Sequence, residues 1–343
     1  MGGGFLKHPG GGPKTGKRNR EDSFATSGLI KRSDKQHTGI LVQNQAMITE
    51  EILRLKEERN AIILVHNYQP GEIQDIADCT GDSLELSRAA ATMDGDVIVF
   101  CGVDFMAETA AILSPKKTVL LPAEDACCPM AQMIGAEELK TAKAKHPDAA
   151  VVCYVNSSAE VKAESDICCT SSNAVRVVNA VEQDTIIFVP DKNLGRYAQR
   201  FTKKTILPWE GFCYVHDRIT PAQIAQAREA YPNAVLLVHP ECRPEVIDLA
   251  DHVASTSGII KEVCSSKAHE FIIGTEVGIL HRLGKECPGK KCYPLSSAAI
   301  CKNMKKMDLT KLRDSLQTLQ PRITVPEDVA ARARGAIERM LAL

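Results

Sequence analysis

The sequence predicts an α/β fold of three similar αβα units, whose short parallel sheets share one interior. The first observation behind this prediction is a spacing of polar residues and cysteines that recurs three times. The second is an alternation of short apolar runs with helical patterns inside each copy. The third is a proline that closes a helical segment, in His146-Pro147, Tyr231-Pro232 and Gln320-Pro321. The steps between these prolines, 85 and 89 residues, divide most of the 343-residue chain into three copies.

Each copy carries an apolar run that ends in a polar cluster, then a hydroxyl side chain, then a cysteine. In chain order these are His66-Asn67-Tyr68, Ser83 and Cys128; Tyr154-Val155-Asn156, Ser171 and Cys213; and His239-Pro240-Glu241, Thr256 and Cys301. The hydroxyl always follows the first polar residue by 17 positions, and the cysteine comes 42 to 45 positions later. Equivalent positions of a repeat face equivalent directions. Around a pseudo-threefold axis, the three cysteines could therefore meet at one point.

Short runs rich in valine, isoleucine and leucine alternate with helical segments. In the first copy we expect strand 62–65, helix 72–78, a helix after Asp82-Ser83, strand 97–100, helix 104–113 and strand 118–121. In the second we expect 150–155, 159–165, 172–181, 186–189, 193–202 and 205–207, and in the third 235–239, 243–250, 257–265, 271–273, 275–283 and 293–295. Strands this short and apolar indicate parallel sheets covered by helices on both faces.

The repeat also predicts the domain organisation. We expect a disordered extension over 1–40, because these residues lack hydrophobic periodicity and the apolar core of a secretory signal. The predicted repeats cover 41–145, 146–231 and 232–321. The C-terminal segment 322–343 is a candidate to pack on the first repeat.

Composition excludes several classes of function. The 42 basic and 43 acidic residues give no overall field for nucleic acid, and no apolar run is long enough to span a bilayer. Thirteen cysteines without an export signal predict a reducing compartment, the cytoplasm. We expect most of them to pack as small apolar side chains: Cys79, Cys153, Cys168, Cys169 and Cys264, and also Cys101, Cys127 and Cys242.

The polar clusters predict a ligand site. Each cluster directly follows the first strand of its copy, and ligands of open α/β sheets bind beyond the carboxyl ends of strands. Ser83, Ser171 and Ser255-Thr256 fall at expected helix starts, where a hydroxyl and free backbone N–H groups can bind an anion. Taken singly, each hydroxyl is better explained as a helix cap. Their threefold register favours the ligand site.

The cysteines in register suggest a metal centre. Structural zinc draws its ligands from short paired motifs, whereas Cys128, Cys213 and Cys301 are 85 and 88 residues apart. Three cysteines with one open position suit an iron–sulfur cluster whose fourth iron binds substrate as a Lewis acid, although the spacing alone leaves the metal undecided. Cys287 and Cys292 have no counterparts in the other copies. They are either a redox-responsive pair or two unrelated loop cysteines.

Several long polar motifs resemble those of one enzyme family. They are His66-Asn67-Tyr68-Gln69, Gly81-Asp82-Ser83-Leu84, Gly102-Val103-Asp104-Phe105-Met106-Ala107-Glu108, Cys128-Pro129-Met130-Ala131, Tyr154-Val155-Asn156-Ser157, His239-Pro240-Glu241-Cys242 and Cys301-Lys302-Asn303-Met304-Lys305-Lys306. Over about residues 48–340 the chain resembles quinolinate synthase, the A protein of bacterial NAD biosynthesis.

The resemblance implies three αβα domains around a pseudo-threefold axis and a [4Fe-4S] cluster held by Cys128, Cys213 and Cys301. It implies a transferase reaction in which iminoaspartate condenses with dihydroxyacetone phosphate to give quinolinate, phosphate and water. The open iron would act as a Lewis acid, without redox turnover. L-aspartate oxidase would supply the iminoaspartate.

Residue types can be matched to this chemistry. Ser171, Ser255 and Thr256 are candidates for the phosphate group, while the dicarboxylate would use His66, Ser83, Tyr154, Asn156 and His239. Carbon–carbon bond formation and dehydration require proton transfers, for which Glu241 is the first candidate, assisted by Tyr68 and His216.

Two other classes of function compete with this interpretation. A non-catalytic or zinc-stabilised three-domain protein could use the strand-end clusters to hold a dicarboxylate. A thiol-redox protein could instead depend on Cys287 and Cys292.

Overall fold

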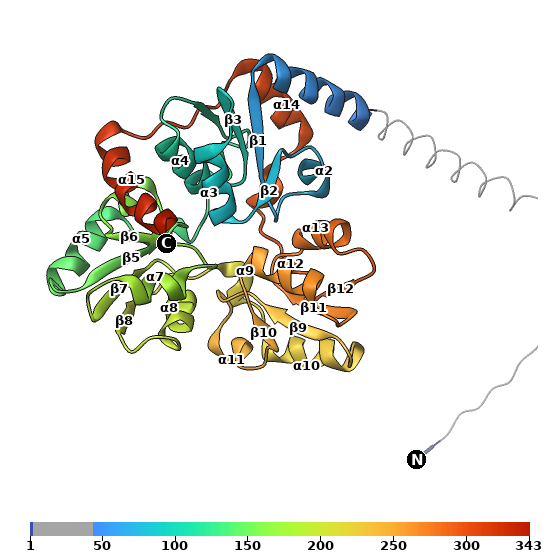
Figure 1. Cartoon of the computed structure of the whole chain (residues 1–343). Helices are drawn as coiled ribbons and strands as arrows, with labels where there is room; N and C mark the ends of the chain where they lie inside the picture. The colour runs from blue at the N-terminus through green and yellow to red at the C-terminus, as the bar shows by residue number, and fades with distance from the viewer. Residues whose placement is uncertain (3–43) are drawn as a thin grey trace, which may run out of the picture. The chain divides into compact units, whose positions relative to one another are not determined.

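Three four-stranded parallel sheets form the framework of the computed structural model, which describes residues 1–2 and 44–343 (Figure 1). The first sheet contains β1 (Ala61–His66), β2 (Cys79–Gly81), β3 (Val97–Cys101) and β4 (Thr118–Leu120), in the order β2-β1-β3-β4. The second, in the order β6-β5-β7-β8, contains β5 (Ala150–Tyr154), β6 (Ile167–Cys169), β7 (Thr185–Val189) and β8 (Thr205–Pro208). The third, in the order β10-β9-β11-β12, contains β9 (Val235–Val238), β10 (His252–Val253), β11 (Glu270–Gly274) and β12 (Lys291–Pro294).

Helices connect the parallel strands and cover the sheets. The first unit has α2 (Gly71–Gln74), α3 (Ser83–Thr92), α4 (Asp104–Leu113), η1 (Ala131–Met133) and α5 (Ala136–Lys145). The second has α6 (Ala159–Ala163), α7 (Ala174–Ala180), α8 (Lys192–Gln199), α9 (Tyr214–Asp217) and α10 (Pro221–Ala230). The third has α11 (Pro244–Ile247), α12 (Thr256–Ser265), α13 (Ile279–Glu286), η2 (Met304–Lys306) and α14 (Leu309–Thr318), and α15 (Glu327–Ala342) ends the chain.

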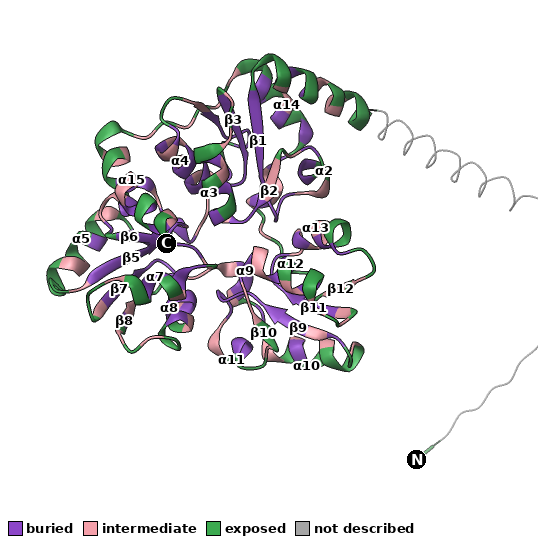
Figure 2. Cartoon of the chain, viewed as in Figure 1, coloured by how far each residue is buried: buried purple, intermediate pink, exposed green. Residues whose placement is uncertain are grey.

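The repeated strand order confirms the predicted fold class. Within Ile48–Leu343, the three sheet-and-helix units surround a common centre (Figure 1). The central strands are buried except for the first residues of β7, β9 and β11, which are partly exposed, whereas the outer faces of the helices are exposed (Figure 2). Because all strands of a sheet run the same way, their carboxyl ends lie along one edge. This geometry decides where the polar clusters lie.

The sequence patterns missed one strand in each sheet. β2, β6 and β10 are edge strands of only two or three residues, each hydrogen-bonded to a neighbour on one side. Two or three residues are too few to show a period, so pattern alone cannot find them. Several predicted helices are also shorter than expected: α2 ends at Gln74, α6 at Ala163, α8 at Gln199 and α11 at Ile247, while α7 covers only Ala174–Ala180 and α13 begins at Ile279.

An aspartate fixes each edge strand against the first strand of its sheet. The carboxylates of Asp78, Asp166 and Asp251 accept the backbone N–H groups of Ile63, Val151 and Leu236 at 2.8, 2.7 and 2.8 Å, respectively. The backbone N–H of each aspartate in turn donates a hydrogen bond to the carbonyl oxygen of the same strand residue. In each case the partners are 15 residues apart. The three copies therefore share a detailed hydrogen-bond pattern as well as a strand order.

The C-terminal segment contacts two of the units. Residues 321–323 bond in antiparallel fashion to the β4 edge, through Leu121 N to Pro321 O and Ile323 N to Val119 O. The following helix, α15, packs mainly on α6 and β6 of the second unit and less on α4 of the first. The domain boundaries drawn from the repeat remain a proposal.

The amino-terminal prediction concerns residues that are largely undescribed. The disordered extension predicted for 1–40 lies outside the described residues, apart from Met1 and Gly2. Among the residues that are described, none of the helices combines the length and apolarity needed to cross a membrane.

The aspartate pattern makes a testable prediction about stability. Asp166→Ala removes the acceptor of the buried Val151 N–H and should lower the free energy of unfolding by about 1–3 kcal/mol. Asp166→Asn keeps a carbonyl acceptor, so its free energy of unfolding should fall by less. Urea unfolding measures both, with exposed Asp148→Ala as the control. Equal stability of the two Asp166 variants would show that the bond to Val151 is unimportant.

Candidate active site

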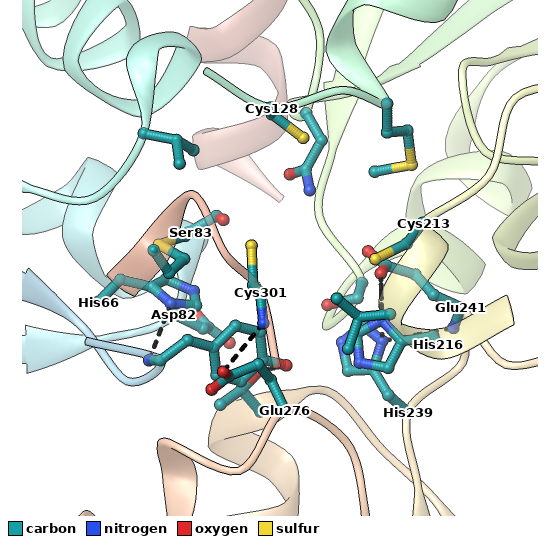
Figure 3. Close-up of a pocket in the computed structure, with 18 of the residues that line it drawn as sticks. His66, Asp82, Ser83, Cys128, Cys213, His216, His239, Glu241, Glu276 and Cys301 are labelled. Atoms are coloured by element: carbon teal, nitrogen blue, oxygen red, sulfur yellow. Dashed lines mark hydrogen bonds and ion pairs between the residues drawn. The ribbon is translucent and has the colours of Figure 1, made fainter. Parts of the chain in front are cut away.

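A cavity lies where the three units meet, at the carboxyl ends of their sheets (Figure 3). It is lined by every site residue predicted from the sequence except Ser255, namely His66, Tyr68, Ser83, Cys128, Tyr154, Asn156, Ser171, Cys213, His216, His239, Glu241, Thr256 and Cys301. The repeat thus identified residues that come together only in the folded chain. Their chemical roles remain predictions.

The three cysteines in register approach the cavity from equivalent loops. Each follows the fourth strand of its sheet. Cys213 directly precedes the short helix α9, and Cys128 and Cys301 lie three residues before the turns η1 and η2. Figure 3 shows their sulfur atoms around the same space. One thiol thus comes from each unit.

These thiols are poor ligands until a cation is present. Burial raises the pKa of Cys128, Cys213 and Cys301 above the ordinary thiol value; Cys301 raises that of Cys128 further, and both of these cysteines raise that of Cys213. Backbone N–H groups act in the opposite direction and lower the pKa of each thiol. They belong to the residue three positions after each cysteine: Ala131, His216 and Met304. A bound metal would hold the sulfurs as thiolates, which the N–H groups would then stabilise.

The spread of the donors distinguishes between kinds of metal group. A single tetrahedral ion with sulfur bonds of about 2.3 Å draws its ligand atoms to within about 4 Å of one another. Within the described residues, the one group with donors all within 4.8 Å is Cys213, His216 and Glu241. Cys128 and Cys301 lie outside it. The three cysteines therefore fit a larger, multi-iron group better than a single ion.

The two strand-end histidines are held as neutral N–H donors. Nδ1 of His66 accepts the backbone N–H of Tyr68 at 3.1 Å, and Nδ1 of His239 accepts that of Glu241 at 3.3 Å. Burial is the main cause that lowers the pKa of both histidines to about 3. A neutral ring that accepts at Nδ1 carries its proton on Nε2. Both residues line the cavity, so each can donate to an anionic oxygen of a ligand.

Glu241 is a buried carboxylate with strong partners. The Tyr154 hydroxyl donates to its Oε1 at 2.5 Å, and His216 Nδ1 lies 2.6 Å from its Oε2. The ring of His239 stacks on that of His216, with 4.4 Å between ring centres. Burial acts to raise the pKa of Glu241, but the hydrogen bonds from His216 and from the Tyr154 hydroxyl outweigh it and lower the pKa below its ordinary value. Glu241 is therefore ionised and can accept a proton.

A chain of hydrogen bonds extends this pair across the cavity wall. His216 Nε2 lies 2.8 Å from Thr275 Oγ1, which lies 2.7 Å from the Tyr68 hydroxyl. The Tyr68 hydroxyl also contacts Thr256 Oγ1 at 2.9 Å. Burial raises the pKa of Tyr68, so its hydroxyl keeps its proton. Tyr68, His216 and Glu241, the three predicted catalytic residues, are thus connected.

The hydroxyl residues divide between cavity and helix cap. Ser83, Ser171 and Thr256 line the cavity. Ser255 does not: it is the N-cap of α12, where its Oγ accepts the Gly258 N–H at 3.2 Å. For Ser255 the capping interpretation therefore describes the observed contact.

Several residues of the site were not found from the sequence. They are the acids Asp82 and Glu276 and the apolar Val103, Phe105, Met106, Met130, Val215 and Met304, all of which line the cavity. The sequence does carry a pattern that marks Asp82, because Asp82 and Glu85 form a capping box at the start of α3. No sequence pattern marks Thr275, because a lone threonine after a strand is not distinctive.

The thiol pair suggested for Cys287 and Cys292 is not formed. Cys287 is bonded instead to Cys264, at the far end of α12, and Cys292 is free. This corrects the expectation that Cys264 serves only as a small apolar side chain. Sequence spacing missed the pair because α12 and α13 lie side by side only in the folded unit.

Known proteins resemble almost the whole described chain. The family model described as quinolinate synthetase A protein matches residues 50–342. A quinolinate synthase from Methanoregula boonei is 71% identical over 88% of this chain and 100% of its own length. One from Desulforudis audaxviator is 58% identical over 86% of this chain and 98% of its own, and quinolinate synthase 2 of Methanosarcina acetivorans is 56% identical over 88% and 98%. The chain therefore belongs to the quinolinate synthetase A protein family.

Proposed function

We propose that this chain condenses iminoaspartate with dihydroxyacetone phosphate to form quinolinate, phosphate and water, in the cytoplasm and as part of NAD biosynthesis. The observation that carries the proposal is that three thiols, one from each unit, line the same cavity as the strand-end donors and the Glu241–His216 pair. L-aspartate oxidase would supply the unstable imine. Family membership and the names of the relatives support the same reaction.

Cys128, Cys213 and Cys301 would hold a [4Fe-4S] cluster with one iron free of protein ligands. That iron would supply Lewis-acid chemistry, polarising a carbonyl or hydroxyl oxygen of the bound substrate. Apolar side chains such as Met130 and Met304 line the cavity beside the cysteines. By keeping water away, they strengthen each charge interaction inside.

The two neutral histidines and Asn156 would bind and orient the substrates. His66 and His239 offer N–H donors to carboxylate oxygens, and Tyr154 and Ser83 add hydroxyls. Asn156 Oδ1 is buried and has no hydrogen-bond partner within the described residues. An unsatisfied acceptor of this kind favours a ligand with an N–H or O–H group, as iminoaspartate and dihydroxyacetone phosphate both have.

The phosphate would be bound by hydroxyls rather than by a cluster of cations. Ser171 lines the cavity from the loop before α7, and Thr256 lies in the first turn of the ten-residue helix α12, where free N–H groups favour an anion. Ser255 would act indirectly, by capping that helix.

Glu241 and His216 would move protons. The ionised Glu241 can take a proton from substrate carbon or nitrogen, and His216 stabilises the carboxylate through its Nδ1–H. Tyr68, connected through Thr275, can return a proton to a leaving hydroxyl. Ring closure needs both steps, because water is lost and a carbon–carbon bond forms.

One observation favours a second candidate. Cys213, His216 and Glu241 could hold a single zinc ion, as a binding protein without a cluster would require. Against it, the histidine and the glutamate are already hydrogen-bonded to each other. Metal analysis separates the two candidates.

The metal content gives the first test of the proposal. Anaerobically purified protein should contain about four irons and four sulfides per chain, and Cys128→Ala, Cys213→Ala or Cys301→Ala should each remove them together with quinolinate formation. Cys79→Ala, which alters a thiol outside the cavity, should keep both. Full iron and sulfide in the Cys213 variant, or one zinc without sulfide in the parent, would contradict the cluster.

The second test concerns proton transfer. Glu241→Gln keeps the size of the side chain but removes the base, so turnover should fall by about 10²–10⁴ while iron content stays unchanged. Steady-state kinetics with a matched iron assay measures both. Parent-like turnover would restrict Glu241 to a positioning role.

A further inference from the structure

Two of the three ligand-loop cysteines donate their backbone N–H to a carboxyl group. The N–H of Cys128 donates to Asp104 Oδ1 at 3.1 Å, and the N–H of Cys301 donates to Glu276 Oε1 at 3.1 Å. In the second unit the corresponding acid is Asp191, and there the backbone makes the connection: the N–H of Lys192 donates to the carbonyl of Gly211, two residues before Cys213, at 2.8 Å. These acids belong to three different units.

The three carboxyl groups occupy equivalent places in the fold. Asp104, Asp191 and Glu276 follow the third strand of each sheet, β3, β7 and β11, by two or three residues. Each also accepts an N–H near the start of the next helix: Phe105 N at 2.8 Å, Leu194 N at 2.8 Å and Gly278 N at 2.6 Å. A carboxyl group with two oxygens can serve a helix start and a second backbone segment together.

This arrangement connects two segments that the sheet alone leaves independent. Each acid follows the third strand of its sheet, whereas the cysteine lies in the loop after the fourth strand, 24 residues beyond Asp104 and 25 beyond Glu276. The carboxyl group joins that loop to the start of the helix after the third strand. In the first and third units, this contact sets where the thiol stands before a metal group binds.

We propose that Asp104 and Glu276 are positioning residues that hold the loops of Cys128 and Cys301 in place for the cluster. The inference deepens the proposed function, because it gives the cluster site prearranged ligands. Neither acid needs to touch the metal. Their effect passes through the backbone of the neighbouring cysteine.

The test compares thiol reactivity in the metal-free protein. Asp104→Ala should raise the rate at which iodoacetamide alkylates Cys128, mapped by mass spectrometry, by about tenfold or more, because a bond to a charged acceptor is lost. Cys213 and Cys301 should react as in the parent. Glu276→Ala should have the converse effect: the alkylation rate of Cys301 should rise, and that of Cys128 should stay as in the parent. A merely structural role would instead raise all three rates together, or none, and either result would overturn the proposal.

Matched variants serve as controls for the alkylation experiment. Asp104→Asn retains the acceptor oxygen and should behave as the parent; an Asn variant as reactive as the Ala variant would refute the role of the hydrogen bond. Glu124→Ala removes an exposed charge from the same loop and should change nothing. If Asp104→Ala does not fold, Glu276→Ala carries the test through the alkylation rate of Cys301.

A second arm uses the cluster itself. After anaerobic reconstitution, the Asp104→Ala protein should lose iron to a chelator about tenfold or more faster than the parent and the Glu124→Ala control. An unchanged rate of iron loss would contradict the proposal. If the parent binds no iron at all, the proposed function fails, and the alkylation pattern still decides whether the acids hold the loops.

Discussion

The direction of the parallel strands is the constraint on which the rest of this structure depends. A parallel sheet presents all its carboxyl ends at one edge, so polar residues at those ends must gather there. With three sheets around one centre, the gathered residues of each unit meet those of the other two (Figure 1). His66, Tyr154 and His239 are thus neighbours although more than eighty residues separate them in sequence.

Burial then gives these residues their chemistry. In water a histidine is partly charged near neutral pH, but burial keeps His66 and His239 neutral and able to donate from Nε2. Glu241 is equally buried and alone would be protonated, yet it is ionised because His216 and the Tyr154 hydroxyl hydrogen-bond to its carboxylate. One cavity therefore holds neutral donors beside a charged base. That combination suits binding of anionic substrates together with proton abstraction.

The sequence predicted the site better than it predicted the local structure around it. A long-period spacing survives in the sequence because each strand end, helix start and loop has to keep its place in its unit, which is how Cys128, Cys213 and Cys301 were found. Thr275 could not be found in this way, since its partners His216 and Tyr68 lie 59 and 207 residues away. The pairing of Cys264 with Cys287 and the edge strand β10 likewise depend on tertiary contacts that leave no local pattern.

The three copies keep some residues in common and differ in others. The cysteine, the acid after the third strand and the aspartate at the edge strand recur in every unit, and the metal group that we propose would need equivalent support from three sides. Two residues beyond the strand-end position, the copies instead carry Tyr68, Asn156 and Glu241. The proposed reaction has two different substrates, which three identical sets of donors could not hold in different ways. One repeated unit can therefore supply both the equivalent thiols and the unequal donors that the proposal requires, provided that only the residues facing the substrates diverge.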